Sequence, residues 1–592
     1  MPAKPSDEIK TRRIHSKQKN GDIYVLERKT LYNTEKQYNE VISTKLVAKI
    51  PKGTENPVPT RPKKAKTVKD TGMISMSDGS NGSGSNQIVA SRMRVGMMDI
   101  IDHIGKVSGI DDAIYANTDI GTAEKIISLA RYLLATNGQS LPGIHTWQYN
   151  HPIPYSEGIS EDIYHDLFRV VGLDETLQQN FFLCRCDNLT DGVAVAYDST
   201  TISTYSENQD EARYGYSKSG EGLKTIKYLS LYSVETQQPI AFTKQPGNLP
   251  DVITIGYALS QLAALGVEKA ELITDNGYYS EKNLSEMFQA HFGFITLAKT
   301  SLKWIWPEID KHRQQIDRLS SACPFEPSTH GVTLILMRDF ARTRKYANRK
   351  TGLNKGDEET FRRKVYLHIF YNAAKKVEED SNFDQDLMSI KKMIEDGTPV
   401  EDLSDALQKK IKKYFIIKVW GKKKSISYNE KACAQAKQHH GFFTLVSNSE
   451  RDTFSALSKY RKREYIEAYF KSAKQHADST RIRVWDADTL RGRMFVQFIS
   501  LCYYEFIREK VRVMKSELGK DDDGADQKLK QQIKLEKKLK RWLENTPIYL
   551  QLQWFDVIEG VQISSKLKSS RWSTETTATD KLYMEKLGMM TE

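Results

Sequence analysis

Apolar residues in the central part of the chain change their spacing several times, from the continuous run of a strand to the period of a helix and back. Continuous β-type runs at 192–204, 224–234 and 239–248 predict three strands, and the amphipathic stretch 252–266 predicts a helix. Residues 269–293 continue as strand, acid-bearing loop and helix. Strands followed by alternating helices and strands predict an α/β fold in which helices flank a mixed sheet.

The rest of the chain divides into regions by composition and periodicity. We predict a small β-containing module at 1–50, a basic linker rich in Pro, Gly and Ser at 51–92, a mainly helical region at 93–190, a first core part at 191–300, an inserted domain with β-strands at 301–450, a second core part at 451–515 and a C-terminal helical region at 516–592. The region at 93–190 could bind DNA or support dimerisation, although core packing alone also explains its apolar stripes.

The segment 460–474, YRKREYIEAYFKSAK, has the period of a helix. At about 100° per residue, Tyr460, Arg463, Glu467 and Lys474 share one stripe about 60° wide, beside a face of apolar residues. One helix is therefore predicted over this segment, with a phenol, a carboxylate and two cations along one side. Such a stripe is either a solvated edge or the wall of a site.

Composition narrows the class of protein. The chain has 592 residues, with 88 Lys and Arg against 76 Asp and Glu, and this net charge of +12 suits a polyanionic partner such as nucleic acid. Its 5 cysteines have no paired spacing, which argues against a disulfide framework or a structural zinc site. The N-terminus has no signal-type apolar core, and no apolar run reaches the roughly 18 residues of a membrane span. We expect a cytoplasmic protein that contacts the nucleoid and no membrane.

Two aspartates follow predicted strands. Asp198 lies at the end of the apolar strand predicted in the first part of the run 192–204, and Asp275 comes directly after the next buried strand and before Asn276-Gly277. A lone aspartate at such a place is most often a turn or cap residue. Two of them at neighbouring strand ends, with a glutamate on a helix packed against the sheet, can instead hold two Mg²⁺ ions for in-line phosphoryl transfer.

These residues resemble the signature of DDE transposases of bacterial insertion sequences, in the branch named YREK. The pattern Y-x2-R-x3-E-x6-K is present at 460–474, VAYDSTTISTYS resembles the strand with the first aspartate, and LITDNGYYSEKNL resembles the second-aspartate motif. Between the two, the glycine-punctuated stretch from YGYSKSGEG to KQPGN is also similar. The resemblance covers about residues 190–510 and implies an RNase H-like core interrupted by a β-rich insertion.

The resemblance implies roles for six residues. Asp198, Asp275 and Glu467 are expected to be the catalytic, metal-binding triad with two Mg²⁺ ions, for which Mn²⁺ can substitute. Tyr460, Arg463 and Lys474 are expected to contact DNA near the reacting phosphate, in agreement with their chemistry as hydrogen-bonding and cationic groups. Glu464 falls at about 40° on the same helical wheel and competes with Glu467 as the third ligand by geometry alone.

The function implied is cleavage of double-stranded DNA at the terminal inverted repeats of a mobile element and transfer of the freed 3′-OH ends into target DNA. A homodimer in the synaptic complex is expected, because two ends must be cut together. Two alternatives stay open: a catalytically inactive DNA-binding protein derived from a transposase, and an RNase H-like nuclease without strand transfer.

Overall fold

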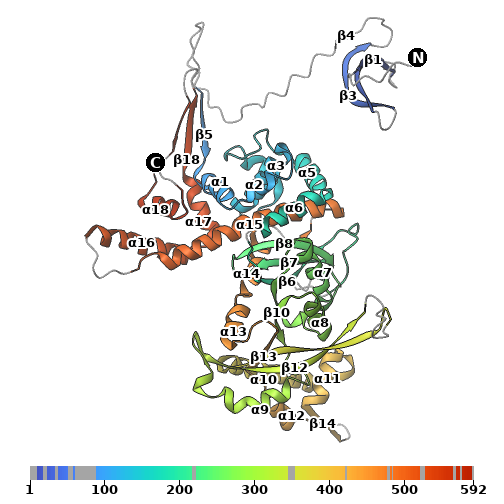
Figure 1. The fold of residues 1–592 in the computed structure, drawn as a ribbon, viewed down its shortest axis with the longest axis vertical. Helices are drawn as coiled ribbons and strands as arrows, with labels where there is room; N and C mark the ends of the chain where they lie inside the picture. The colour runs from blue at the N-terminus through green and yellow to red at the C-terminus, as the bar shows by residue number, and fades with distance from the viewer. Residues whose placement is uncertain are drawn as a thin grey trace. The chain divides into compact units, whose positions relative to one another are not determined.

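The computed structural model describes the residues in the following ranges: 10–17, 23–33, 38–50, 58–59, 89–187, 189–215, 222–344, 354–420, 423–476, 481–482, 484–520, 527–564, 569–573 and 576–589. The chain forms two compact units, 1–79 and 80–592 (Figure 1). Most of the predicted basic linker lies outside the described residues. Among the helices that are described, none is both long and apolar enough to cross a membrane.

The first unit is a four-stranded antiparallel sheet in the order β1-β2-β3-β4. Its strands are β1 (Lys10–Lys17), β2 (Ile23–Asn33), β3 (Tyr38–Ile50) and β4 (Val58–Pro59). Each strand pairs with the next one in the sequence, so the unit is a simple meander of local connections. The small β-containing module predicted at 1–50 falls within this unit.

A bundle of helices opens the second unit. It comprises α1 (Gly96–Val107), α2 (Ile110–Tyr115), α3 (Ile120–Ala135), η1 (Leu141–Gly143), α4 (Ile144–Trp147), α5 (Glu161–Leu173) and α6 (Glu175–Cys186). The long helix α15 (Ala487–Glu517) packs against α3 and α5. Gly172 on α5 and Gly492 on α15 allow this close crossing, because a Cβ atom at either position would collide with the backbone of the other helix.

The centre of the second unit is a 10-stranded mixed sheet in the order β11-β12-β13-β16-β10-β9-β6-β7-β8, with β17 paired to β6. Its first strands are β6 (Val193–Thr204), β7 (Lys224–Ser233), β8 (Gln238–Pro246), β9 (Ala270–Thr274) and β10 (Gly293–Ala298). β6, β9 and β10 are mutually parallel, whereas β7 and β8 are antiparallel additions. The mixed α/β sheet flanked by helices that the sequence predicts is confirmed.

Helices cover both faces of this sheet. On one face, Tyr228 of β7 contacts Phe470 of α14 (Glu464–His476), and Phe242 of β8 contacts Phe498 of α15. On the other face, the Tyr197 hydroxyl of β6 donates to the carbonyl of Thr254, which lies between η2 (Asp251–Ile253) and α7 (Ile255–Ala264). Helix α8 (Glu281–Gln289) packs beside α7. Alternate residues of β6 therefore face two different sets of helices.

The segment predicted as an inserted domain contributes its long strands to the same sheet. β12 (Glu326–Thr343), β13 (Glu358–Asn372) and β16 (Phe442–Ser447) continue the sheet from β10. The stretch 365–370 of β13 is buried on both faces, which is the pattern of an interior strand. The remaining elements of this segment are α9 (Trp306–Ile316), η4 (Leu319–Ser321), β11 (Ala322–Cys323), α10 (Ala373–Glu395), η5 (Val400–Asp402), α11 (Asp405–Tyr414), β14 (Phe415–Trp420), β15 (Lys423–Tyr428) and α12 (Glu430–Lys437).

Part of that segment does form a core of its own. Helices α10, α11 and α12 and the two-stranded sheet β14-β15 share a small hydrophobic cluster that is distinct from the main core. Its buried members are Leu387, Ile390, Ile394, Ile411, Phe415 and Cys433. This element with its own core lies between β13 and β16 in the sequence, within the segment 301–450 predicted as an inserted domain.

The predicted single helix over 460–474 is wrong. α13 (Thr453–Arg461) ends before α14 begins, and Lys462 and Arg463 form a turn between them. In this turn the amide of Arg463 donates to the Tyr460 carbonyl, and the amide of Ile466 donates to the Arg463 carbonyl, each three residues back. This tighter spacing rotates Tyr460 away from the angle that a continuous 100° period assigns to it.

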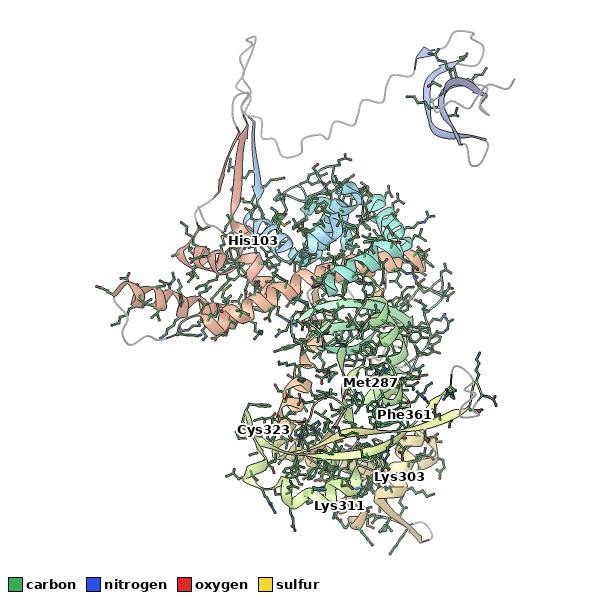
Figure 2. All side chains as sticks on the ribbon, viewed as in Figure 1. His103, Met287, Lys303, Lys311, Cys323 and Phe361 are labelled. Atoms are coloured by element: carbon green, nitrogen blue, oxygen red, sulfur yellow. The ribbon has the colours of Figure 1, made fainter. Side chains whose placement is uncertain are left out.

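The C-terminal region contains a sheet as well as the predicted helices. Its elements are α16 (Gln527–Asn545), α17 (Ile548–Trp554), η6 (Phe555–Val557), β18 (Glu559–Ser564), β19 (Ser569–Ser573) and α18 (Ala578–Lys586). β18 lies between β19 and β5 (Val89–Arg94), which joins the two ends of the second unit. His103 of α1 also contacts the carbonyl oxygen of Leu587 at 3.1 Å (Figure 2).

Candidate active site

The sheet places Asp198 and Asp275 side by side. β6 and β9 run parallel, and their last paired residues are Ala196 and Ile273. Each aspartate lies two residues further along its strand direction, at the point where β9 has ended and β6 continues. Beyond Ala196, no pairing between β6 and β9 is described. Both carboxylates therefore lie at the point where these two strands stop pairing.

Each aspartate is held by its local backbone. Oδ1 of Asp198 accepts from the amide of Ser199 at 2.7 Å, and Oδ1 of Asp275 accepts from the amide of Asn276 at 2.7 Å. Asp275 is also the N-terminal cap of η3 (Asn276–Tyr278). A carboxylate fixed by its own backbone has little rotational freedom to lose when it binds a ligand.

Arg463 links the first aspartate to the glutamate of α14. Its Nη1 lies 3.3 Å from Oδ2 of Asp198, and its Nη2 forms an ion pair with Oε1 of Glu467. The side chain of Arg463 is 11% exposed, whereas that of Glu467 is 53% exposed. The turn between α13 and α14 therefore brings one buried cation against two carboxylates that are 269 residues apart in the sequence.

Tyr460 extends this group of contacts to the second aspartate. Its hydroxyl donates to Oδ1 of Asp275 at 3.4 Å, and the guanidinium of Arg463 lies 5.6 Å from the centre of its ring. Five of the six predicted site residues are thus connected in one cluster. These five residues, Asp198, Asp275, Tyr460, Arg463 and Glu467, are called the DDE cluster below.

Burial and charge set the protonation of the two residues from the turn. Burial alone would lower the pKa of Arg463, but Tyr460, Asp275 and Asp198 beside it raise that pKa above the ordinary value. Burial raises the pKa of Tyr460, and the charge of Asp275 adds to this, against the opposing effect of Arg463. At neutral pH the cluster therefore holds a cationic guanidinium and a neutral phenol.

The structure separates Glu467 from its rival Glu464. Glu467 contacts Arg463 within the cluster, whereas Glu464 is exposed and has no ion pair or hydrogen bond with the residues that the structure describes. Lys474 lies two helical turns beyond Glu467. It is half-buried and lines a small cavity with Thr200, Ile202 and Tyr228, so it lies further along β6 than the DDE cluster.

The cluster contains acceptor groups that hard cations prefer. Three carboxylates supply only oxygen donors, which are the ligands of Mg²⁺ and Mn²⁺. Among the described residues, however, no three His, Cys, Asp or Glu side chains converge closely enough to hold a metal ion. The carboxylate oxygens of the cluster fit a divalent cation. In this structure, however, Glu467 forms an ion pair with Arg463 and does not converge with the two aspartates.

Sequence reasoning missed several residues around the aspartates. Tyr278 donates to Oδ1 of Asp198 at 3.4 Å, and Ser199 donates to Oδ1 of Asp251 at 2.7 Å, where Lys227 also donates at 2.6 Å. Tyr278 lies within the quoted motif LITDNGYYSEKNL, so its position next to Asp275 was a usable signal. Asp251 is a lone loop aspartate, and its pattern carries no such signal.

Comparison with known proteins identifies the domain. The family model of the transposase DDE domain matches residues 190–379, which include Asp198 and Asp275. Comparison with the curated proteins gave no match. A solved structure, the cryo-EM structure of the piggyBac transposase synaptic complex with hairpin DNA, is similar with 11% sequence identity and a TM-score of 0.33, over 77% of this chain and 78% of that chain.

The chain therefore contains a transposase DDE domain, and the class of enzyme that this domain defines is the DDE transposase. This confirms the class that the sequence resemblance implied. Glu467 and the other residues of the YREK pattern lie beyond the matched segment, so the YREK branch stays a prediction.

Proposed function

We propose that this transposase cleaves double-stranded DNA at the terminal inverted repeats of its element and joins the 3′-OH ends to target DNA. The observation that carries the proposal is the DDE cluster: Asp198 within β6 and Asp275 just after the adjacent parallel strand β9, with Glu467 of a covering helix linked to Asp198 through Arg463. The net charge of +12 supports a DNA partner. The contacts of Tyr460, Arg463 and Glu467 support membership of the YREK branch.

Asp198, Asp275 and Glu467 would hold two divalent cations, with Mg²⁺ as the natural choice. When bound, such ions lower the pKa of an attacking water or 3′-hydroxyl and stabilise the leaving oxygen of an in-line displacement. The carboxylates of the chain contribute by position: two are fixed to their own backbone amides, and the third is exposed enough to move toward them.

Arg463 and Tyr460 would orient the DNA strand. Among the described residues, the buried Nε of Arg463 has no hydrogen-bond partner, so this guanidinium retains a donor for a phosphate oxygen. The neutral hydroxyl of Tyr460 can donate to a second oxygen of the same backbone. Lys474, two turns along α14, would contact a phosphate further along the strand as a point charge.

The assembly proposed is a homodimer on two element ends. Coupled cutting of both ends requires two copies of the DDE cluster, which is the reason for expecting a dimer in the synaptic complex. The DNA in this complex is double-stranded at both the element ends and the target.

The test is nicking of a terminal-repeat duplex in Mg²⁺ by the wild type, Glu467→Ala and Glu464→Ala. We expect Glu467→Ala to lower the nicking rate by about 100- to 1000-fold, because it removes a proposed ligand of the cation that stabilises transition-state charge. Glu464→Ala, the control on the same helix, should nick at the wild-type rate.

The same experiment separates the alternatives. If neither the wild type nor the variants nick while all bind the duplex, the chain is a DNA-binding protein without catalysis. Cleavage without joined products on a target plasmid would indicate a nuclease that lacks strand transfer. Wild-type nicking by Glu467→Ala would contradict the site assignment itself.

A further inference from the structure

A buried lysine and a half-buried aspartate lie directly behind the DDE cluster. Nζ of Lys227, on β7, is 2.6 Å from Oδ1 of Asp251 and also donates to the carbonyl of Leu249. The lysine side chain is 8% exposed and the aspartate side chain 38% exposed. The same Oδ1 accepts from the Ser199 hydroxyl at 2.7 Å. One carboxylate oxygen therefore joins β6, β7 and η2.

This pair lies on the opposite face of the sheet from Arg463 and Glu467. Successive residues of a strand point to opposite faces, so Ser199 points away from the face that Asp198 shares with α14. Lys227 pairs with Thr201 across the strands and shares the face of Ser199. Asp251 thus approaches the first catalytic aspartate from behind, where it can fix the strand without occupying the place of a ligand.

The pair also reaches the second aspartate. A Cβ atom at Gly277, two residues after Asp275, would lie 3.7 Å from Oδ2 of Asp251, so η2 and η3 are in van der Waals contact. The buried side-chain amide of Asn283 ties these two turns together, because it donates to the carbonyls of both Val252 and Tyr278 at 2.7 Å. Asp251 therefore connects the strand of Asp198 with the turn of Asp275.

Simple packing does not require this arrangement. Burying a lysine costs free energy unless a carboxylate and further acceptors compensate for it, and an apolar residue at this interior position of β7 would avoid that cost. The lysine balances the charge of a carboxylate placed close to Asp198 and Asp275. Asp251 can thereby make two hydrogen bonds next to the cluster without adding net negative charge to it.

We propose that Lys227 and Asp251 form a positioning pair that fixes the spacing of Asp198 and Asp275 and thereby sets the affinity of the site for divalent cations. This inference rests on the proposed function of the DDE cluster. Groups that orient metal ligands typically change metal affinity by about 10- to 100-fold when they are removed. Neither residue is expected to touch the substrate or the metal.

The test measures Mn²⁺ binding to the full chain by electron paramagnetic resonance, alongside thermal unfolding. Asp251→Asn keeps the shape of the side chain but removes the charge that Lys227 needs. We expect it to raise the Kd for Mn²⁺ by about 10-fold or more. Ser199→Ala, which removes the bond from Asp251 to β6 and the contact of Ser199 with Tyr278 but keeps the Lys227–Asp251 pair, should raise the Kd by a smaller factor and gives a second measurement if Asp251→Asn folds poorly.

A matched control lies in the same sheet. Lys244 of β8 is 8% exposed and pairs at 2.7 Å with Glu211, which is 29% exposed, yet none of the hydrogen bonds and ion pairs among the described residues connects this pair directly to either aspartate. Glu211→Gln should lower the melting temperature while the Kd for Mn²⁺ stays at the wild-type value. If Asp251→Asn also leaves the Kd unchanged, the pair is merely structural and the proposal is overturned.

Two further outcomes are decisive. A loss of Mn²⁺ binding in Asp251→Asn as complete as that in Asp198→Asn would make Asp251 a direct ligand and overturn its positioning role. A wild-type chain that binds no Mn²⁺ would overturn the proposal together with the metal site. By contrast, failure of the proposed function alone would appear as Mn²⁺ binding that depends on Asp251 without any nicking of DNA.

Discussion

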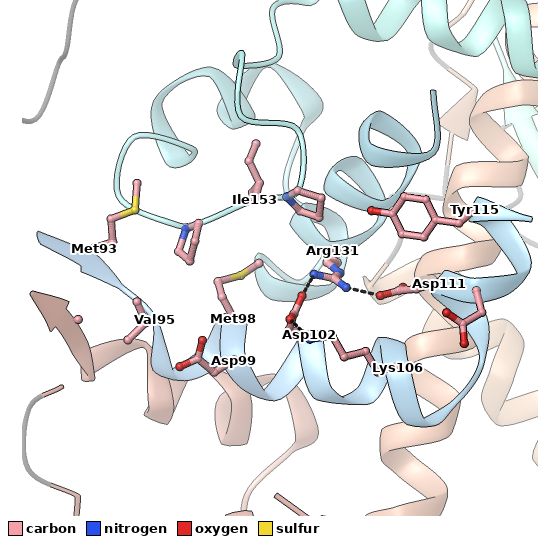
Figure 3. A pocket seen from close by; sticks show the side chains of 14 residues that line it. Met93, Val95, Met98, Asp99, Asp102, Lys106, Asp111, Tyr115, Arg131 and Ile153 are labelled. Carbon is pink, nitrogen blue, oxygen red and sulfur yellow. Dashed lines mark hydrogen bonds and ion pairs between the residues drawn. The ribbon is translucent and has the colours of Figure 1, made fainter. Parts of the chain in front are cut away.

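Two buried arginines in this molecule each hold a pair of carboxylates, and they do so in different surroundings. Arg131 of α3 lies 2.5 Å from both Asp102 and Asp111 in the helical bundle, beside a cavity of about 520 Å³ (Figure 3). Arg463 lies between Asp198 and Glu467 at the sheet. Residue types alone do not distinguish the two groups.

The difference lies in what holds the carboxylates. Asp111 is 8% exposed, accepts from the Tyr503 hydroxyl of α15 and has no freedom to leave its arginine. Glu467 is 53% exposed on its helix and has Arg463 as its described ion-pair partner. Each arginine therefore holds one enclosed carboxylate, Asp111 or Asp198, and one more exposed carboxylate, Asp102 or Glu467. The two groups differ in the surroundings of the enclosed carboxylate: Asp111 is held by buried Tyr503, whereas Asp198 lies beside Asp275 at the sheet.

The largest expected effect is on the stability of the helical bundle. Arg131→Met should lower the free energy of unfolding by about 3–5 kcal/mol, because it leaves the buried carboxylate of Asp111 without its cation. Urea unfolding followed by circular dichroism measures this loss. Arg463→Met should lose less, because Glu467 becomes solvated and Asp198 keeps its hydrogen bonds from Ser199 and Tyr278. Equal losses would remove the distinction drawn between the two arginines.

The next largest effect is on activity. Here the variant of Arg463 should lose more than a variant in the Arg131 group. Arg463→Met should slow nicking of a terminal-repeat duplex by about 100-fold, since one donor to the reacting phosphate is lost. Asp102→Asn in the bundle is the matched control, and it should nick at the wild-type rate under conditions where the protein is folded. An unchanged rate in Arg463→Met would mean that its ion pairs with Asp198 and Glu467 are structural.

The smallest effect concerns pH within the Arg131 group. Burial opposes ionisation of Asp102, but Arg131 and Lys106 hold its pKa below the ordinary value of 3.8. Its contribution to stability is therefore present above about pH 3.8 and is lost as the pH falls through the lowered pKa. Because Asp102 is half-exposed, we expect a difference below about 1 kcal/mol between wild type and Asp102→Asn.

The contribution of Asp111 to stability should depend on pH with the opposite sign. Burial raises its pKa despite the charge of Arg131, so its contribution declines as the pH rises through the raised pKa. Urea midpoints of Asp102→Asn and Asp111→Asn, measured between about pH 3 and pH 6, should thus diverge from the wild type in opposite directions. Parallel changes would show that both carboxylates are solvated.

The sequence carried enough information for the alternating core and for the two aspartates that follow uninterrupted apolar runs, Asp198 and Asp275. β9 ends before Asp275 as predicted, whereas β6 continues through Asp198 to Thr204, so the predicted strand end at Asp198 is wrong. The spacing of the YREK pattern predicted Glu467 as the third carboxylate of the site. The structure then distinguishes Glu467 from Glu464, because Glu467 contacts Arg463. The helix breaks at Lys462 and Arg463, where the Arg463 side chain is buried against Asp198, and a wheel with one fixed period contains no such information.

Long-range pairing explains the other differences. The strands β12, β13 and β16 have the pattern of strands in any sheet, and nothing in that pattern states that they join β10 instead of forming a separate domain. The pairing of β5 with β18 was missed for the same reason. Asp251 was missed because its role depends on Lys227 and Ser199, which are brought to it only by the folded sheet.

The pairing of β5 with β18 has a consequence for the time at which this protein becomes complete. Arg92 and Glu559, which form an ion pair across these strands, are 467 residues apart. At about 5–20 residues per second, the ribosome needs roughly 25–90 s to supply the second strand after the first has emerged. During this interval α3 and α5 also lack α15, whose apolar side they bury. The helical bundle therefore leaves the ribosome well before the segments that complete it, and it is where nascent chains should depend most on chaperones.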